Sequence, residues 1–429
     1  MNVQTKPVET ETDAAAIVRD LGQRAKAAAA ALRTASSDAK NTALREAARL
    51  IRAERPAILA ANARDMDAAR ANGLNDAMLD RLLLNDARVE GMAAGLDDIV
   101  ALPDPVGQVI EAWTRPNGLR ISRVRVPIGV IGVIYESRPN VTADAGALCL
   151  KSGNVVILRG GSESFHSSRA IAACLRRGLA AATLPDDCIQ LVLTTDRAAV
   201  GALLQATGFL NLIVPRGGRA LIDRVAAESR VPVLKHFEGL CHVYVDGAAD
   251  IAMARDVVAN AKMRRVGVCG AAETVLIDRS ALATHGKPVI DRLIELGCAV
   301  RGDAAVRAID PRIAAATDDD WRTEYLAPIV SIATVDGVDG AMHHIATWGS
   351  GHTDAIITSD AAIAARFLDE VDSAIVMHNA STQFADGGEF GLGAEIGIST
   401  DRLHARGPVG LVELTTYKNV VRGQGTVRP

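Results

Sequence analysis

Gly129-Val-Ile-Gly-Val-Ile134 and Val155-Val-Ile-Leu-Arg-Gly-Gly161 contain the pattern that decides the fold. Each begins as a short β-rich run, and an alanine-rich helical stretch separates the two. The alternation continues through Ile189-Gln-Leu-Val-Leu193 and Leu212-Ile-Val214. This order is typical of a parallel sheet that is covered by helices on both faces. We therefore expect an α/β domain here.

A second series of strand-like runs predicts a second parallel α/β domain. Its members are Cys241–Val245, Glu273–Ile277, Ile329–Ile332, Asp354–Ile357 and Ala374–Met377. The fold class is therefore α/β, with two parallel sheets.

Residues 12–100 are expected to be helical, because their apolar side chains recur three and four positions apart. Ser37 is the predicted cap of the helix that contains Leu44. Asn72-Gly73 should end the helix that precedes Asn75, and Asn75 should begin the next one.

Two further segments stand outside this alternation. Residues 109–126 alternate in polarity around Asn117-Gly118, which predicts a β-hairpin. An isolated two-stranded ribbon is marginal in water, so we expect it to pack on something else, such as another subunit. Residues 379–410 are rich in glycine and polar residues, and we expect an ordered functional loop or an arm there.

The composition is that of a globular protein of 429 residues, with 49% hydrophobic and 23% charged residues. The 47 basic and 51 acidic residues give a net charge of -4, which argues against a nucleic-acid or other polyanion-binding protein. There is no secretory leader or membrane-spanning run, so a cytoplasmic protein is expected. The six cysteines form no CxxC pair and are predicted to be mostly reduced core residues.

Two glycine-rich turns indicate a dinucleotide site. Arg159-Gly160-Gly161-Ser162-Glu163 and Arg216-Gly217-Gly218 each follow a predicted strand and precede a predicted helix. Backbone N–H groups can approach a phosphate where side chains are absent. Either turn alone could be an ordinary connection, but both together favour a dinucleotide. Arg159 or Arg216 could bind a 2′-phosphate, which favours NADP over NAD.

Cys269 is a candidate nucleophile. It lies in a turn between a predicted helix and a predicted strand, and Arg264 and Arg265 flank it with charges that would stabilise a thiolate. A second possibility is a metal site at His343, His344 and His352, although their spacing fits no standard zinc motif.

Several motifs together resemble the γ-glutamyl phosphate reductases, a branch of the aldehyde dehydrogenase superfamily. They include Val126–Val141, the two glycine-rich turns, Phe390–Glu395 and His404–Gly410. The resemblance covers all but about the first dozen residues. It implies an aldehyde dehydrogenase-like fold with a small β oligomerisation element.

The resemblance also implies an activity, which is the NADPH-dependent reduction of L-glutamyl 5-phosphate to glutamate 5-semialdehyde in proline biosynthesis. Cys269 matches the nucleophile that forms a thioester, and Asn140 matches an oxyanion donor. Glu324 matches the glutamate that holds the nicotinamide ribose. Arg265 and Arg138 are candidates for binding the substrate phosphate or carboxylate, and His352 belongs to the family signature and is placed with the substrate residues.

The sequence departs from related patterns at two places. Hydrolytic aldehyde dehydrogenases have a glutamate that activates water against the thioester, and the matching position here is His236, unless the alignment shifts by two residues to Glu238. Loss of that base would suit an enzyme in which phosphate is the acyl acceptor. Gly270 stands where the family frequently has asparagine, next to the nucleophile.

The expected domain organisation follows from these assignments. An NADP-binding domain should comprise residues 1–108 and 123–238, a catalytic domain residues 239–377, and an oligomerisation hairpin and C-terminal arm residues 109–122 and 378–429. The resemblance implies a homo-oligomer, and contact with the glutamate 5-kinase that makes the acyl phosphate is a further hypothesis. Two alternatives remain, namely a metal-dependent dehydrogenase that uses the three histidines and a non-catalytic partner of that kinase.

Overall fold

The computed structural model describes residues 14–234 and 238–428. The chain forms two compact units. Unit 1 contains the described residues up to Val233 together with those from Leu414 on, and unit 2 runs from Leu234 to Glu413. Residues 378–413, which we expected in the arm, thus belong to unit 2.

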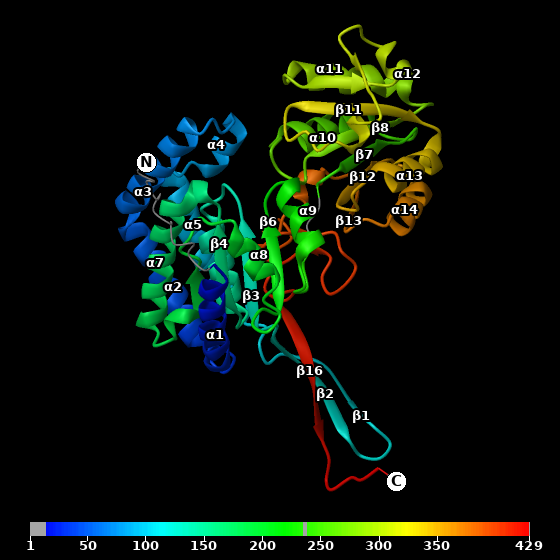
Figure 1. Cartoon of the computed structure of the whole chain (residues 1–429). Helices are drawn as coiled ribbons and strands as arrows, with labels where there is room; N and C mark the ends of the chain where they lie inside the picture. Colours follow the sequence, from blue (N-terminus) through cyan, green and yellow to red (C-terminus); the bar gives the residue numbers. More distant parts are fainter. Residues whose placement is uncertain (1–13, 235–237, 429) are drawn as a thin grey trace, which may run out of the picture. The chain divides into compact units, whose positions relative to one another are not determined.

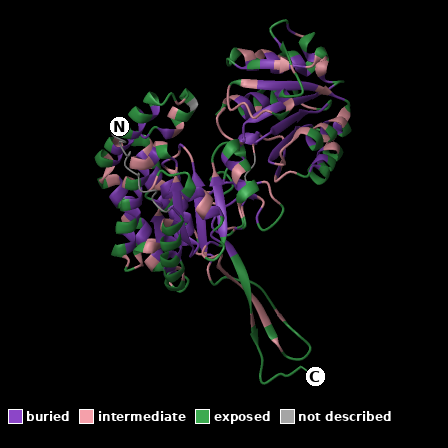
Figure 2. Ribbon diagram, viewed as in Figure 1, coloured by how far each residue is buried: buried purple, intermediate pink, exposed green. Residues whose placement is uncertain are grey.

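Unit 1 is built on a four-stranded parallel sheet in the order β5-β4-β3-β6. The strands are β3 (Val130–Tyr135), β4 (Val155–Gly160), β5 (Ile189–Leu191) and β6 (Leu212–Arg216), so all four predicted runs are confirmed. Figure 2 shows these strands buried beneath helices. The connecting and covering elements are α1 (Ala14–Leu32), α6 (Val141–Lys151), η1 (Ser162–Ser164), α7 (Phe165–Ala181), η2 (Asp186–Cys188), α8 (Ala198–Leu204) and α9 (Arg219–Glu228).

The N-terminal helical region of unit 1 continues with α2 (Ser37–Ala53), α3 (Arg55–Ala71), α4 (Asp76–Leu82) and α5 (Asp86–Ala101). Asn75 caps α4 as predicted, because its side chain accepts a hydrogen bond from the Met78 N–H. The prediction of Ser37 as a cap was wrong by one residue. Ser36 caps α2, while Ser37 donates to Asp104 at 2.7 Å.

The predicted hairpin is confirmed and has a third strand. β1 (Val109–Thr114) pairs with β2 (Arg120–Pro127), and β16 (Thr415–Arg422) pairs with the other edge of β2, all antiparallel. Figure 1 shows the three strands together as a narrow ribbon. Arg123 lies between two aromatic rings, 5.5 Å from Trp113 and 5.2 Å from Tyr417. These cation–π contacts stabilise a ribbon that has little core of its own.

Unit 2 has a seven-stranded parallel sheet in the order β10-β9-β11-β8-β7-β12-β13. The five predicted strands are confirmed as β7 (Cys241–Val245), β8 (Ala272–Asp278), β11 (Ile329–Val335), β12 (Thr353–Ile357) and β13 (Ile375–His378). The short strands β9 (Ala299–Gly302) and β10 (Ala314–Ala315) at one edge were not predicted.

Helices pack on both faces of the unit 2 sheet. α10 (Ile251–Met263) and α11 (Lys287–Glu295) contribute to one hydrophobic cluster, and α13 (Gly337–Trp348) and α14 (Ala361–Glu370) contribute to another (Figure 1). The shorter elements are η3 (Leu282–Gly286), α12 (Ala304–Arg307), η4 (Asp320–Arg322), η5 (Thr382–Phe384), β14 (Ile398–Ser399) and β15 (Gly407–Pro408).

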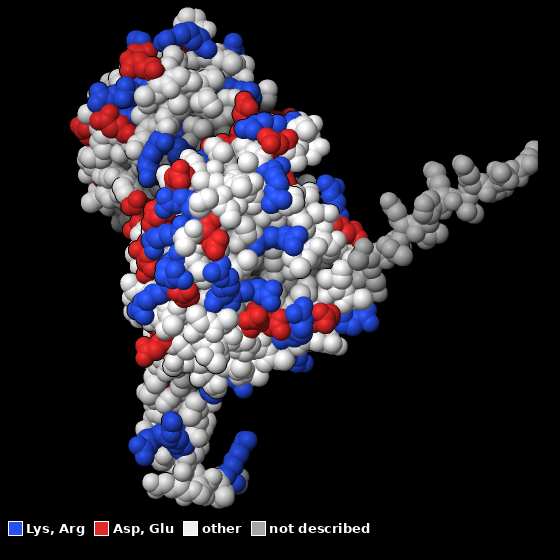
Figure 3. All heavy atoms as spheres, turned by 90° about the vertical axis from the view of Figure 1, so that its left-hand side faces the viewer, with Lys and Arg blue, Asp and Glu red and all other residues white. Residues whose placement is uncertain are grey.

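Surface charge and hydropathy agree with the composition. Basic and acidic side chains are interspersed on the face drawn in Figure 3. Among the ion pairs of the protein, Arg52 binds both Glu90 and Asp97. Among the described residues, no helix is long and apolar enough to cross a membrane.

Close packing of α7 against α2 makes a stability prediction. A Cβ added at Gly178 in α7 would lie 2.4 Å from the Ala43 carbonyl oxygen, whereas one added at Gly91 in α5 would meet nothing within 4 Å. We expect Gly178→Ala to lower the free energy of unfolding by about 1–3 kcal/mol through overpacking. Gly91→Ala, the matched control, should raise it by about 0.5–1 kcal/mol because alanine favours the helix. Thermal and urea unfolding measure both, and an equal response would contradict the packing argument.

Candidate active site

Cys269 lies in the turn between the end of α10 and the start of β8. All six cysteines are free thiols, and Cys269 is the one that is half-buried while the other five are buried. Arg264 and Arg265 are exposed on the same turn. The Gln383 amide donates to the carbonyls of Ala261 at 2.9 Å and Arg265 at 3.3 Å, which ties this turn to the η5 segment.

Gly270, the residue after Cys269, lies in a closely packed part of the turn. A Cβ at this position would lie 2.9 Å from the Thr382 carbonyl oxygen and 3.5 Å from the Ala385 side chain. The η5 segment therefore packs so closely on the turn that a side chain after Cys269 would force it to move.

Gly239 lies against the backbone of Cys269 from the other side. A Cβ at Gly239 would lie only 2.0 Å from the Cys269 carbonyl oxygen and 2.8 Å from its Cα. The Cys241 thiol donates to the same carbonyl oxygen at 3.1 Å. The main chain at Cys269 is thus fixed by the segment that leads into β7. His236, the predicted replacement for a catalytic glutamate, lies outside the described residues.

Glu324 belongs to the same arrangement in unit 2. Its Oε1 atom accepts a hydrogen bond from the Gly239 N–H at 2.9 Å. The structure therefore joins two predicted site residues, Glu324 and Cys269, through Gly239, which contacts both.

His352 is completely buried behind this site. Its Nδ1 atom lies 2.9 Å from the Thr353 hydroxyl and 3.5 Å from the Cys241 sulfur. Burial lowers the pKa of His352 to about 4, so the ring is neutral at pH 7. The His352 ring contacts the Cys241 thiol, whose hydrogen bond fixes the Cys269 carbonyl. The assignment of His352 as a substrate residue stays a prediction.

The other two histidines of the hypothetical metal site have different surroundings. His343 is exposed, while the His344 ring packs edge-on against Trp321 at 5.3 Å and His242 at 5.6 Å. Burial lowers the pKa of His344 to about 3. Within residues 14–234 and 238–428, no group of three His, Cys, Asp or Glu side chains is arranged to hold a metal ion.

The first glycine-rich turn of unit 1 is held by its own side chains. Arg159 is buried, and its guanidinium donates to the carbonyls of Gly160, Thr195 and Asp196 at 2.7, 3.1 and 3.4 Å. It therefore fastens a neighbouring loop to the turn. Glu163 accepts from the N–H of Ser137 at 2.5 Å and from its hydroxyl at 3.0 Å. Contact of Arg159 with a 2′-phosphate stays a prediction.

The second turn presents a backbone donor to an anion. The N–H of Gly218, the residue just before α9, donates to a Glu136 carboxylate oxygen at 3.0 Å. A Cβ at Gly217 would lie 2.5 Å from that same oxygen, so only glycine allows the approach. Arg216 is half-buried at the end of β6. The turn fits a negatively charged group such as a phosphate.

Asn140 and Arg138 follow β3 in unit 1 and are both half-buried. The Asn140 amide donates to an Asp144 carboxylate oxygen at 2.9 Å. Burial raises the pKa of Asp144 to about 6, although the Asn140 hydrogen bond and the charge of Arg216 oppose the shift. The amide orientation of Asn140 is thereby set by a carboxyl group one helical turn away.

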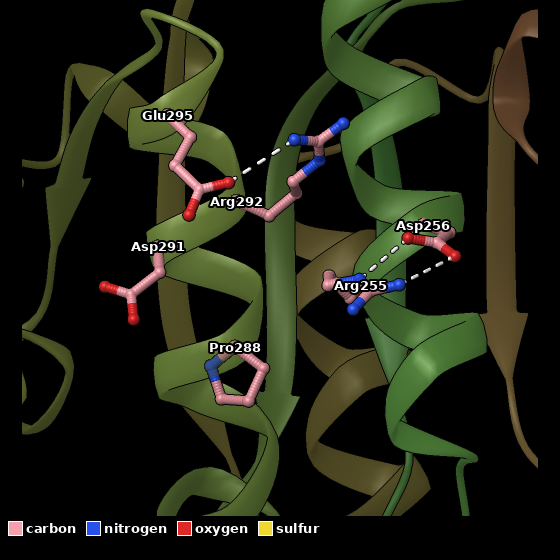
Figure 4. Close-up of a pocket in the computed structure, with 6 residues that line it drawn as sticks. All are labelled: Arg255, Asp256, Pro288, Asp291, Arg292 and Glu295. Carbon is pink, nitrogen blue, oxygen red and sulfur yellow. Dashed lines mark hydrogen bonds and ion pairs between the residues drawn. The ribbon is translucent and has the colours of Figure 1, made fainter.

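A surface pocket of unit 2 lies apart from all these residues. Figure 4 shows it between α10 and α11, lined by Arg255, Asp256, Pro288, Asp291, Arg292 and Glu295. Arg255 pairs with Asp256 at 2.8 Å, and Arg292 pairs with Glu295 at 3.3 Å. Asp291 pairs with Lys287 and Arg312, so the charged side chains of the lining are all in ion pairs, and the pocket includes none of the predicted site residues.

Comparison with known proteins agrees with this arrangement. The aldehyde dehydrogenase family pattern matches residues 4–306. The γ-glutamyl phosphate reductase of Paramagnetospirillum magneticum is 60% identical over 98% of this chain and 99% of its own, and that of Rhodospirillum rubrum is 63% identical over 98% of each.

A solved structure extends the agreement to three dimensions. The crystal structure of the Thermotoga maritima γ-glutamyl phosphate reductase superimposes with a TM-score of 0.93 at 44% identity, over 96% of this chain and 100% of the other. The chain is therefore an oxidoreductase that belongs to the γ-glutamyl phosphate reductase branch of the aldehyde dehydrogenase family.

Proposed function

We propose that the protein reduces L-glutamyl 5-phosphate to L-glutamate 5-semialdehyde and phosphate with NADPH, the second step of proline biosynthesis from glutamate. The observation that carries the proposal is the half-buried Cys269 turn, joined through Gly239 to Glu324, in a chain about 60% identical to named reductases of this substrate.

The Cys269 thiolate attacks the carbonyl carbon of the acyl phosphate, and the C–O bond to phosphate breaks to leave a thioester. Bound NADPH would supply a hydride to the carbonyl of that thioester. The Cys269 sulfur is a good leaving group, so collapse of the thiohemiacetal releases the aldehyde. The oxyanion in each step needs donors, and we assign this role to the Cys269 N–H and the Asn140 amide.

The cofactor would be held by the two glycine-rich turns, with Gly160–Glu163 at one and Arg216–Gly218 at the other. The support is the Gly218 N–H, which already binds a carboxylate oxygen, and the absence of room for a side chain at Gly217. Arg216 is better placed than Arg159 to meet a 2′-phosphate, because the Arg159 guanidinium binds three carbonyls. Glu324 would hold the nicotinamide ribose.

Substrate binding and assembly complete the proposal. Arg265 is exposed on the nucleophile turn and suits the substrate phosphate or carboxylate, and Arg138 is the second candidate. The β1-β2-β16 ribbon exposes the apolar side chains of Val109, Ile110, Tyr417 and Val421, which suit contact with another subunit. Contact with glutamate 5-kinase would protect the acyl phosphate from cyclising.

Phosphate dependence of the reverse reaction tests the chemistry. NADPH formation from NADP⁺ and glutamate 5-semialdehyde should require inorganic phosphate, and Cys269→Ala should lower it at least about a thousandfold because the nucleophile is lost. Cys174→Ala, at a buried thiol of α7, is the matched control and should retain turnover. Turnover without phosphate would mean that water is the acceptor. If Cys269→Ala retains turnover and a chelator abolishes it, the metal site at the three histidines would be favoured. If the protein binds glutamate 5-kinase normally but shows no turnover, a non-catalytic partner would be favoured.

The oxyanion role of Asn140 predicts a selective loss of turnover. Asn140→Ala should lower kcat by roughly 100-fold or more, because an oxyanion donor acts mainly in the transition state. The KM for glutamate 5-semialdehyde should change little. The rate at which iodoacetamide alkylates Cys269 should stay at the wild-type value, which separates loss of a donor from damage to the nucleophile. A large rise in KM with normal kcat would contradict the assignment.

Asp144 predicts a pH-dependent difference in stability. Because burial raises its pKa from 3.8 to about 6, the folded protein holds this proton more tightly than the unfolded chain. The group therefore costs stability as pH rises from about 4 to about 6, and the full cost remains above that range. Asp144→Asn should raise the melting temperature at pH 8, and the gain should shrink as the pH is lowered through 6 towards 5. A gain that is independent of pH would contradict the argument.

A further inference from the structure

A buried ion pair lies at the base of the nucleophile turn. The Lys262 Nζ atom is 2.5 Å from a Glu273 carboxylate oxygen, and the two side chains are 0% and 2% exposed. Removing two charges from water is costly, and well-packed apolar residues often serve stability as well or better. Stability alone therefore gives little reason for these two residues to be charged.

The pair joins the two ends of the turn that contains Cys269. Lys262 is in the last turn of α10, and Glu273 is the second residue of β8. The eleven-residue separation of the two side chains spans the whole turn, including Cys269. Their contact holds the helix end and the strand start at a fixed distance.

Glu273 also reaches the segment that contains Glu324. Its second carboxylate oxygen accepts from the Leu326 N–H at 3.3 Å, and Leu326 has a left-handed backbone with φ of 49°. Such a conformation is costly for leucine unless the surroundings hold it. Two residues earlier, Glu324 accepts from the Gly239 N–H, and Gly239 lies against Cys269. Glu273 is therefore connected to the Cys269 turn in two ways, directly through Lys262 and indirectly through the segment that contains Glu324.

We propose that Lys262 and Glu273 are positioning residues, and that Glu273 places Glu324 for the cofactor through the Leu326 N–H while the pair holds the Cys269 turn. The inference rests on the proposed function, because it assigns Glu324 to the nicotinamide ribose. Neither residue is a catalytic residue, since each acts through the backbone of others.

Substituting only Lys262 or only Glu273 would leave the other residue as an unpaired buried charge, and the effect of that charge could not be separated from loss of the positioning role. Burial raises the pKa of Glu273 to about 7 although Lys262 opposes the shift, so removing Lys262 alone would favour a protonated carboxyl. Lys262→Met alone would therefore change the charge state of Glu273 as well as its partner. Variants that remove both charges avoid this.

The test compares K262M/E273Q with K262M/E273M. Both lack the buried charges, but only the glutamine keeps an oxygen that can accept from Leu326 N–H. Thermal unfolding establishes that each is folded, and the equilibrium Kd for NADPH is measured by fluorescence in the absence of substrate. We expect K262M/E273M to bind NADPH at least about fivefold more weakly than K262M/E273Q, as loss of one ordinary hydrogen bond would cause. Equal Kd values in the two folded variants would overturn the proposal and leave the pair a purely structural feature.

A second measurement applies if K262M/E273M does not fold. K262M/E273L and Glu324→Gln are then combined in a double-mutant cycle on the NADPH Kd, with K262M/E273Q as its reference, because leucine at position 273 also leaves the Leu326 N–H without this acceptor. Coupling of the two residues predicts that the double variant loses less affinity than the product of the single losses, and strictly multiplicative losses would overturn the proposal.

The same proteins separate this inference from the proposed function. A wild-type protein that binds NADPH but shows no phosphate-dependent turnover would refute the proposed reaction, and the Kd comparison would still decide the role of the pair. A wild-type protein that binds no NADPH would overturn both.

Discussion

The contact between the Gly239 backbone and the Cys269 carbonyl group is the constraint on which the arrangement in unit 2 depends. There is no space for a side chain at Gly239, so the segment entering β7 and the turn entering β8 meet main chain to main chain. The same glycine donates to Glu324. The proposed nucleophile would need little reorganisation to react, because its neighbours on both sides are already packed.

In unit 1, two carboxylates accept hydrogen bonds at or beside the glycine-rich turns. Its glycine-rich turns lie at the carboxyl ends of parallel strands, where ligands usually bind in open α/β sheets. Glu136 accepts from the second turn, and Glu163 folds back from the first turn onto Ser137. An anion that binds at Gly218 must compete with a carboxylate for the same N–H. The exchange of one negative group for another keeps the donor satisfied in both states.

Sequence reasoning predicted those features of the fold and site that depend on local pattern. The hairpin follows from Asn117-Gly118, and nine of the eleven strands described in the two parallel sheets follow from apolar runs bounded by turns. β9 and β10 were not predicted, because strands of four and two residues are too short to show a periodic pattern. β16 was not predicted, because it pairs with β2, which lies almost 300 residues earlier in the chain, and no local pattern indicates such a distant partner. Ser36 and Ser37 are equivalent by composition, and only the side-chain geometry assigns the cap.

The site residues divide in the same way. Cys269, Glu324 and the glycine turns were predicted from motifs, whereas the Lys262–Glu273 pair was not, because a lysine near a helix end and a glutamate in a strand are usually exposed. Their burial depends on how β8 and α10 pack, and no local pattern encodes that. A usable signal did exist in Glu273, which lies between Ala271-Ala272 and the apolar Val275–Ile277 run of the predicted strand. A charged residue in a fully buried strand must have a partner, and the partner must come from an adjoining element. Here the partner is Lys262 of α10, the helix that ends where the Cys269 turn begins, so the contact that neutralises Glu273 also joins the two ends of that turn.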